Sequence, residues 1–185
     1  TRKDLPGFDQ FRFRPGDIKG TWQNIEDVEV LTFHNWYMSR LRVASIDDAS
    51  RVVRFTGTTF AKSDWSDLRE GLRYIVDNVA DALEVPGEWY LDRKTGVLTY
   101  IPMPGEDPAK AEVIAPRLEQ LVTLKGDIGA KKFVEFLKFQ GLTFSHSNYK
   151  LPPKGYSFCQ AEAALSGAIV ATGARDCAFE GCAIS

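Results

Sequence analysis

The stretch HNWYMSR (34–40) concentrates side-chain types that bind sugars in proteins. Aromatic rings stack on the apolar faces of sugar rings, whereas Arg side chains hydrogen-bond to the hydroxyl groups. Trp36 and Arg40 have the same parity, so an extended strand would present both on one face. We therefore predict that both residues bind substrate. The alternative is that Trp36 is a core residue and that Arg40 pairs with an acid such as Glu29.

A second stretch, FSHSNYK (144–150), contains three more residues of these types. We expect it to leave a strand at a turn, where ligand-binding residues often lie. His146, Asn148 and Tyr149 are therefore also predicted to bind substrate. Ser and Asn are common turn formers as well, which leaves a purely local role open.

Hydrolysis of a glycosidic bond requires two carboxyl groups, about 5–5.5 Å apart for retention and about 6.5–9.5 Å apart for inversion. The C-terminal part of the chain offers four carboxylates: Glu135, Glu162, Asp176 and Glu180. Asp176 and Glu180 share parity, so both would point outward from the same coil. Outward carboxylates also belong to ordinary solvated surfaces, and the sequence leaves the catalytic residues unknown.

No cofactor and no metal site is predicted. The only histidines are His34 and His146, and neither has a second ligand type beside it in a metal-binding spacing. The three cysteines, Cys159, Cys177 and Cys182, cannot all pair with one another, and we expect buried thiols at Cys177 and Cys182, which fall at apolar positions.

The charge balance of the chain argues against a nucleic-acid partner. Its 185 residues contain 23 Lys and Arg and 25 Asp and Glu, giving a formal net charge of −2. Binding to nucleic acid would require a basic face. Membrane insertion is not predicted either, because no apolar run approaches the ~20 residues that a bilayer requires.

The N-terminal part of the chain is rich in strand signals. Apolar and polar residues alternate with period two in three segments: 27–33, 36–46 and 51–57. The segment 73–83 has roughly helical spacing and ends before Pro86. EWYLDRKTGVLTYIP (88–102) predicts a hairpin with Gly96 in its loop. We predict an antiparallel β module over residues 1–130, with a short helix and this hairpin.

From residue 131 onward, short apolar strands repeat. When Gly181 is set over Gly141, 40 residues earlier, Phe179 falls on Phe139 and Ile184 on Phe144. A coil of a parallel β-helix takes about 20–25 residues, so this interval predicts two coils with stacked apolar interiors. The LxxLxL signature of Leu-rich repeats is absent. Residues 131–185 are therefore predicted to start a parallel β-helix, although two partial matches leave a self-contained globule open.

The chain stops on the second match of this repeat, at Ser185. An uncapped coil exposes apolar surface and open strand edges. We therefore expect the natural protein to continue, and we expect the uncapped C-terminal coil to be a place of association.

Long ordered motifs give the chain a family resemblance. The run RYIVDNVADALEVPGEWYLDRKTGVLTYIPMPGEDPAKAEVIAPRLEQLV (73–122) resembles a signature of bacterial right-handed parallel β-helix proteins that act on carbohydrates. DVEVLTFHNWYMSRLRVASID (27–47) is similar to the stretch that those proteins place before it. The group includes glycoside hydrolases, among them α-L-fucosidases and xylanases. The resemblance implies a truncated right-handed β-helix after the N-terminal module, with catalytic acids on later coils.

The resemblance also implies a function. We expect the N-terminal part of a secreted or periplasmic glycoside hydrolase that degrades complex polysaccharide, with its catalytic acids downstream and this chain inactive alone. The alternative is a non-catalytic glycan-binding or adhesin-type β-helix protein, and the expected partner in both cases is a polysaccharide or oligosaccharide. A third possibility is a structural role, in which the β module seals the first coil and buries Trp36 and Arg40.

Overall fold

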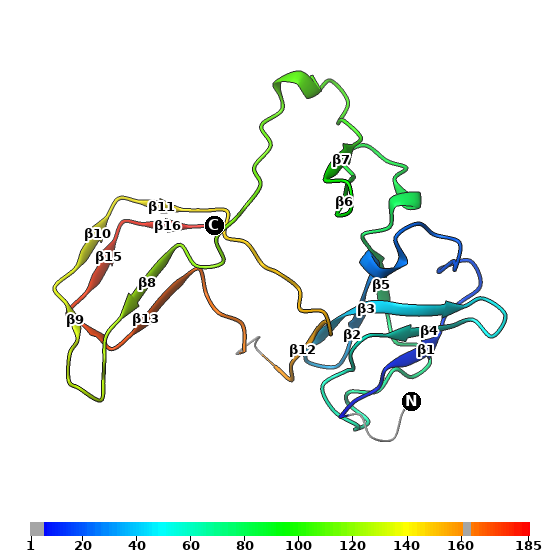
Figure 1. The fold of residues 1–185 in the computed structure, drawn as a ribbon, viewed down its shortest axis with the longest axis horizontal. Coiled ribbons are helices and arrows are strands. Elements are labelled where there is room, and N and C mark those ends of the chain that lie inside the picture. Colours follow the sequence, from blue (N-terminus) through cyan, green and yellow to red (C-terminus); the bar gives the residue numbers. More distant parts are fainter. Residues whose placement is uncertain (1–5, 161–163) are drawn as a thin grey trace. The chain divides into compact units, whose positions relative to one another are not determined.

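The computed structural model describes residues 6–160 and 164–185 and is mainly β, with only short 3-10 helices in the described part (Figure 1). Contacts divide the chain into two units. The first comprises Thr1–Ala111 and Leu151–Ala163, and the second comprises Glu112–Lys150 and Ala164–Ser185. This division differs from the predicted one after residue 130, because a strand at Val122–Lys125 already pairs within the second unit.

The first unit carries short helices and antiparallel strands. Its strands are β1 (Gln10–Arg12), β2 (Glu29–Phe33), β3 (Met38–Asp47), β4 (Val52–Phe55), β5 (Tyr74–Asp77), β6 (Trp89–Asp92), β7 (Val97–Tyr100) and β12 (Tyr156–Ser157). Its 3-10 helices are η1 (Ile25–Asp27), η2 (Ala80–Ala82) and η3 (Pro108–Lys110).

An antiparallel sheet with the strand order β1-β4-β3-β2-β5 forms the body of the first unit, and β12 also pairs with β3. The strand predicted over residues 27–33 is confirmed as β2, and the side chains of Val28, Val30 and Thr32 are buried as its alternation implied, although Glu29 between them is buried as well. Val30 lies opposite Leu41 of β3, which is buried as well. Alternation thus turns one face of the predicted strands toward a common core.

This sheet curls so that its two end strands approach each other. Phe11 of β1 and Tyr74 of β5 pack with their ring centroids 4.9 Å apart, although their strands are at opposite ends of the strand order. The backbone N–H of Arg14 also donates to the Tyr74 hydroxyl over 3.4 Å. The curl encloses the apolar core, whose buried members are Phe13, Ile18, Val28, Val30, Leu41, Val43, Val53, Phe55 and Val79.

The helix predicted over residues 73–83 is wrong. Residues Tyr74–Asp77 form β5, which pairs antiparallel with β2, and only Ala80–Ala82 form a short 3-10 turn. Tyr, Ile and Val favour strands, and the edge of β2 offers hydrogen bonds that an isolated short helix lacks. Asn78 follows with φ = 58°, which ends the strand.

The predicted hairpin over residues 88–102 is confirmed. β6 and β7 pair antiparallel, and Gly96 in their loop has φ = 73°. The hairpin is held in the first unit through Arg93, whose guanidinium lies 3.5 Å from the carboxylate of Asp27 and 3.6 Å from that of Glu29.

The second unit contains two layers of short strands. The first layer consists of β8 (Val122–Lys125), β9 (Val134–Glu135), β10 (Lys138–Gln140) and β11 (Thr143–Phe144). The second layer consists of β13 (Ile169–Thr172), β14 (Ala174–Arg175), β15 (Ala178–Glu180) and β16 (Ala183–Ile184). Each strand of the first layer pairs parallel with the corresponding strand of the second.

The 40-residue repeat of the sequence sets the register of this pairing. Phe139 is the strand partner of Phe179, and Phe144 is the partner of Ile184. The matched residues are therefore direct neighbours, and the prediction that the interval holds two coils is wrong. The 40-residue interval corresponds to one layer of strands rather than two. The remaining length is taken up by a long connection between β11 and β13, which includes β12 of the first unit.

The corners between strands repeat as well as the strands. Phe136 and Asp176, 40 positions apart, have φ values of 59° and 53°, and Gly141 and Gly181 have 65° and 58°. At another corner, a Cβ on Gly126 would lie 2.2 Å from the carbonyl oxygen of Gly173. The two layers can approach at this corner only because no side chain stands there.

Candidate functional site

Trp36 lies in the loop between β2 and β3 and is exposed over 63% of its surface. The alternative that made it a core residue is therefore wrong. Trp36 precedes β3, which begins at Met38, so it does not share a strand face with Arg40. Its ring instead lies near that of Trp65, with the centroids 6.4 Å apart.

A continuous series of aromatic rings extends from this loop. Trp65 contacts Phe60 with ring centroids 5.9 Å apart, and Phe60 contacts Phe158 at 5.4 Å. We call the side chains of Trp36, Trp65, Phe60 and Phe158 the aromatic surface. It joins segments that are distant in the sequence, because β12 returns the chain to the first unit just before Phe158.

The loop that carries Trp36 is stabilised by contacts between the residues on either side of it. The backbone N–H of His34 donates to the carbonyl of Tyr37 over 2.9 Å, and the two rings stack with their centroids 4.3 Å apart. The hydroxyls of Tyr37 and Ser66 are hydrogen-bonded to each other, and the edge of the Tyr37 ring faces Trp65 at 6.0 Å. Trp36 is therefore presented by a turn whose neighbours are packed and hydrogen-bonded.

The imidazole of His34 hydrogen-bonds to other side chains of the protein. Its Nε2 lies 3.1 Å from the hydroxyl of Thr32 and 3.0 Å from that of Ser39, which in turn bonds to Ser157 over 2.8 Å. Burial of the ring lowers the pKa of His34 to about 4, against an ordinary value of 6.5. The imidazole is therefore neutral near pH 7, and it orients the loop.

Arg40 is held by acids on neighbouring strands. Its guanidinium lies 2.5 Å from the carboxylate of Glu29 and 2.9 Å from that of Asp77. This is the ion pair that the alternative interpretation of Arg40 predicted. Arg42 adds a second contact to Glu29 at 3.4 Å, so the buried carboxylate lies among several guanidinium groups.

The other three predicted binding residues lie in the second unit, after β11. His146 has φ = 60° and so turns the chain, as the sequence suggested for this stretch. The backbone N–H of Asn148 donates to the carbonyl of Leu118 over 2.7 Å, and the side chain of Tyr149 is exposed. They belong to a different unit from the aromatic surface.

Two of the carboxylates considered for catalysis pair with basic side chains of the adjacent layer. Glu135 bonds to Arg175, and the carboxylate of Glu180 lies 2.6 Å from the ammonium group of Lys138. Asp176 stands at a corner with positive φ, and Glu162 lies outside the described residues. Glu135 and Glu180 thus act as ordinary surface ion pairs between layers.

The described part of the chain contains neither a cluster of metal ligands nor a helix that could span a membrane. Within residues 6–160 and 164–185, no three His, Cys, Asp or Glu side chains cluster closely enough to hold a metal ion. Over the same residues, no helix combines the length and apolar character that crossing a bilayer takes.

Sequence reasoning missed most of the aromatic surface. It selected Trp36 but not Trp65, Phe60 or Phe158, because these residues stand in different segments without a shared pattern. Trp65 lies in the polar stretch KSDWSD (62–67), and an isolated Trp among polar residues is the one signal that could have found it.

Fold and site together define a mainly β protein with a curled antiparallel sheet and an aromatic surface in which Trp36 is exposed and Trp65, Phe60 and Phe158 are half-buried. The chain is similar to a solved structure titled "Glycoside hydrolase", with a TM-score of 0.63 and 26% sequence identity. The match covers 76% of this chain and 25% of that one, so the chain aligns with about a quarter of the neighbour's length. No protein-family model and no curated protein matches the chain. The likeness supports a glycoside-hydrolase-like fold.

Proposed function

We propose that this chain recognises glycans through the aromatic surface, as the N-terminal part of a carbohydrate-active protein. The observation that carries the proposal is the 63% exposure of Trp36 beside Trp65. Apolar side chains gathered in a contiguous surface patch mark binding sites, and aromatic rings are the groups on which sugar rings stack. Similarity to a glycoside hydrolase supports the same substrate class.

Binding, rather than catalysis, is the role that we assign to these residues. Two of the carboxylates considered for catalysis, Glu135 and Glu180, are ion-paired in the second unit, whereas the residues that form the aromatic surface belong to the first. Catalytic acids of a longer hydrolase would then lie outside this chain. A non-catalytic, adhesin-type protein is the second candidate, and it is favoured by the same aromatic surface.

The second unit is best explained as the start of a right-handed parallel β-helix. Four successive strands of one layer pair in order and in parallel with four of the next. Parallel strands joined by a crossover are right-handed in almost all proteins. We further propose a secreted or periplasmic location, where polysaccharides are encountered, and we propose no role for nucleic acid or membrane insertion.

The proposal is tested by comparing two tryptophans of equal exposure. Trp36 and Trp89 are both 63% exposed, but Trp89 belongs to the β6–β7 hairpin and not to the aromatic surface. Trp36→Ala should weaken binding of neutral xylose- or fucose-containing oligosaccharides about tenfold in calorimetric titration, whereas Trp89→Ala should leave it unchanged. Equal losses for both variants, or no binding by the unaltered chain, would overturn the proposal.

The same oligosaccharides test where the catalytic acids lie. We expect no hydrolysis when the chain is incubated with them and reducing ends are assayed. Turnover by this chain would instead assign catalysis to carboxylates described above.

A further inference from the structure

The curled sheet of the first unit contains a pocket of about 530 Å³ near the meeting of β1 and β5. Its volume lies in the range of small-molecule sites. The lining includes Phe11 and Tyr74, whose packing closes the sheet, and the segment Leu68–Leu72 that precedes β5. It includes no member of the aromatic surface, so this is a separate place on the first unit.

Positive charge is concentrated in this pocket. Four arginines line it, Arg12, Arg14, Arg51 and Arg69, against a single acid, Glu70. The chain as a whole has a formal net charge of −2, so the excess is local. A concentration of one sign of charge in a concave site raises the local concentration of ligands of the opposite sign.

Most of these guanidinium groups are not engaged by protein carboxylates. Arg69 pairs with Asp67 at 3.3 Å and donates to the carbonyl of Asp64. Over residues 6–160 and 164–185, Arg12, Arg14 and Arg51 have no ion pair. This contrasts with Arg40, which contacts two acids on the same sheet.

The fold positions these arginines from two sides. Arg12 and Arg14 come from β1 and its continuation, and the N–H of Arg14 is fixed on the hydroxyl of Tyr74. Arg51 comes from the β3–β4 connection, and its carbonyl accepts from the N–H of Phe13 over 2.9 Å. Tyr74 itself donates to Asp17 over 2.5 Å, and burial is the main cause that raises the pKa of its hydroxyl to about 12.

We propose that this pocket binds an acidic saccharide, with its carboxylate or sulfate group on the arginines and its ring against Phe11 and Tyr74. The planar guanidinium group forms paired hydrogen bonds with both kinds of anion. Aromatic side chains add an apolar face for the sugar ring. A second hollow of about 400 Å³ shares Arg14 and Tyr74 with the pocket and gives room for a neighbouring sugar. The choice of a saccharide rests on the proposed function, whereas the anionic character does not.

The test is calorimetric titration of the whole chain with four ligands: trigalacturonate, a sulfated disaccharide, a neutral trisaccharide and inorganic sulfate. We expect trigalacturonate or the sulfated disaccharide to bind, and to bind less tightly as salt is raised. Arg12→Gln and Arg14→Gln should each weaken this binding about tenfold, as loss of a charged hydrogen bond predicts. Both side chains are exposed, so the fold should tolerate the changes.

Arg54→Gln is the matched control, because it removes the same charge from an exposed position of β4 outside the pocket. It should change acidic-saccharide binding less than twofold. Equal effects of Arg54→Gln and Arg14→Gln, or no binding of either acidic saccharide, would overturn the proposal. Equally tight binding of inorganic sulfate would overturn the saccharide assignment.

Trp36→Ala separates this proposal from the proposed function. It should leave acidic-saccharide binding unchanged while weakening the binding of neutral oligosaccharides. The arginine variants should weaken acidic-saccharide binding and leave the binding of neutral oligosaccharides unchanged. Loss of acidic-saccharide binding in Trp36→Ala would place that ligand on the aromatic surface and overturn the assignment to this pocket.

Discussion

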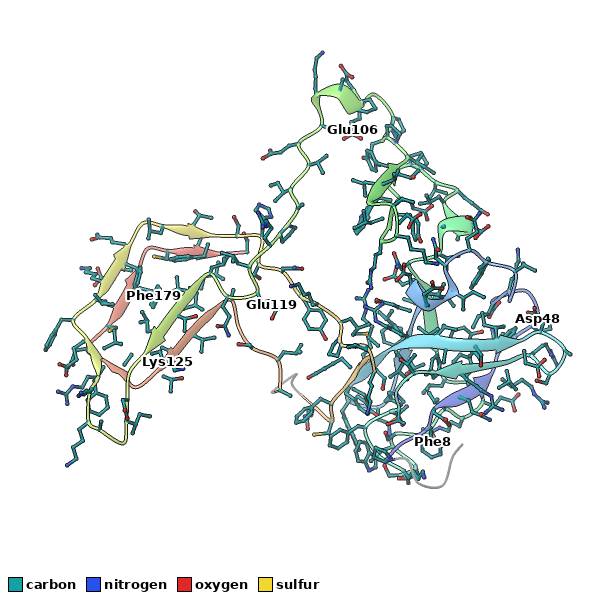
Figure 2. All side chains as sticks on the ribbon, viewed as in Figure 1. Phe8, Asp48, Glu106, Glu119, Lys125 and Phe179 are labelled. Carbon is teal, nitrogen blue, oxygen red and sulfur yellow. The ribbon has the colours of Figure 1, made fainter. Side chains whose placement is uncertain are left out.

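Phe139 and Phe179 stack with their ring centroids 4.6 Å apart and their planes within 7° of parallel (Figure 2 labels Phe179). They are also strand partners, so the same two residues align the backbones of both layers. Phe144 packs edge-on against both rings, at 6.3 and 6.1 Å. Side-chain packing and backbone pairing therefore enforce one register in the second unit.

A double-mutant cycle on Phe139→Leu and Phe179→Leu should reveal this coupling. We expect an interaction free energy of about 1 kcal/mol in the stability of the second unit, measured by hydrogen exchange of β10 and β15 amides. Pairing Phe139→Leu with Phe136→Leu is the control, because Phe136 is exposed. Strictly additive effects for Phe139 and Phe179 would contradict the stacking.

Closure of the curled sheet depends on Phe11. Phe11→Ala removes contacts to both Tyr74 and Phe55, and because the side chain is half-buried we expect a loss of about 2 kcal/mol in the free energy of unfolding. Ile75→Ala, at an exposed position of β5, should cost less than about 0.5 kcal/mol. Urea denaturation followed by tryptophan fluorescence measures both, and similar losses would contradict a specific closing contact.

Glu29 is the buried centre of an ion-pair network. Glu29→Gln leaves Arg40 and Arg42 without their shared counter-charge, so we expect the free energy of unfolding to fall by about 3 kcal/mol. Asp77→Asn removes a carboxylate that is half exposed and also contacts Arg40, and it should cost about 1 kcal/mol or less. Thermal unfolding of both variants provides the comparison, and a larger effect of Asp77→Asn would refute the ranking.

Gly126 lies at a close approach between the two layers. An alanine there would place its Cβ against the carbonyl oxygens of Gly173 and Lys132, at 2.2 and 2.8 Å. We expect Gly126→Ala to destabilise the second unit by about 2 kcal/mol or more. Gly129→Ala, where the nearest atom is 3.5 Å away, should be nearly neutral. Hydrogen exchange at β8 and β13 would register the difference.

The half-buried imidazole of His34 should make the stability of the first unit sensitive to acid. Its pKa in the folded protein is about 4, below the ordinary 6.5, because burial disfavours the charged form. The unfolded chain therefore binds more protons between these values, and stability falls as the pH drops from about 6.5 to about 4. Since water reaches part of the ring, we expect a loss of about 1 kcal/mol. His34→Gln should reduce this slope, and an unchanged slope would show that other groups cause it.

Local patterns predicted the strands well where one face is buried. Val28, Val30 and Thr32 alternate as the sequence implied, and the hairpin around Gly96 follows from its turn residues. The repeat around Gly141 and Gly181 correctly paired residues 40 positions apart. Each of these features depends on neighbours in the sequence or on a visible repetition.

Features that depend on the folded chain were not accessible in this way. β5 was mistaken for helix because pairing with β2 decides its conformation, and short apolar runs satisfy both periods. The repeat gave the number of residues between matched positions but not the number of layers. A long connection between β11 and β13 lengthens the interval without adding a layer. The aromatic surface and the arginine pocket collect side chains from several segments, and no spacing rule connects these.

The chain crosses between its two units three times, after Ala111, after Lys150 and after Ala163. A reading frame that stops at Ala111 would therefore omit β12, which lies against β3, and Phe158 of the aromatic surface. Neither unit can be excised as one uninterrupted gene segment. A nick by a protease after Ala111 would separate the two parts of the first unit covalently, and they would then be held together only by non-covalent contacts such as the pairing of β12 with β3.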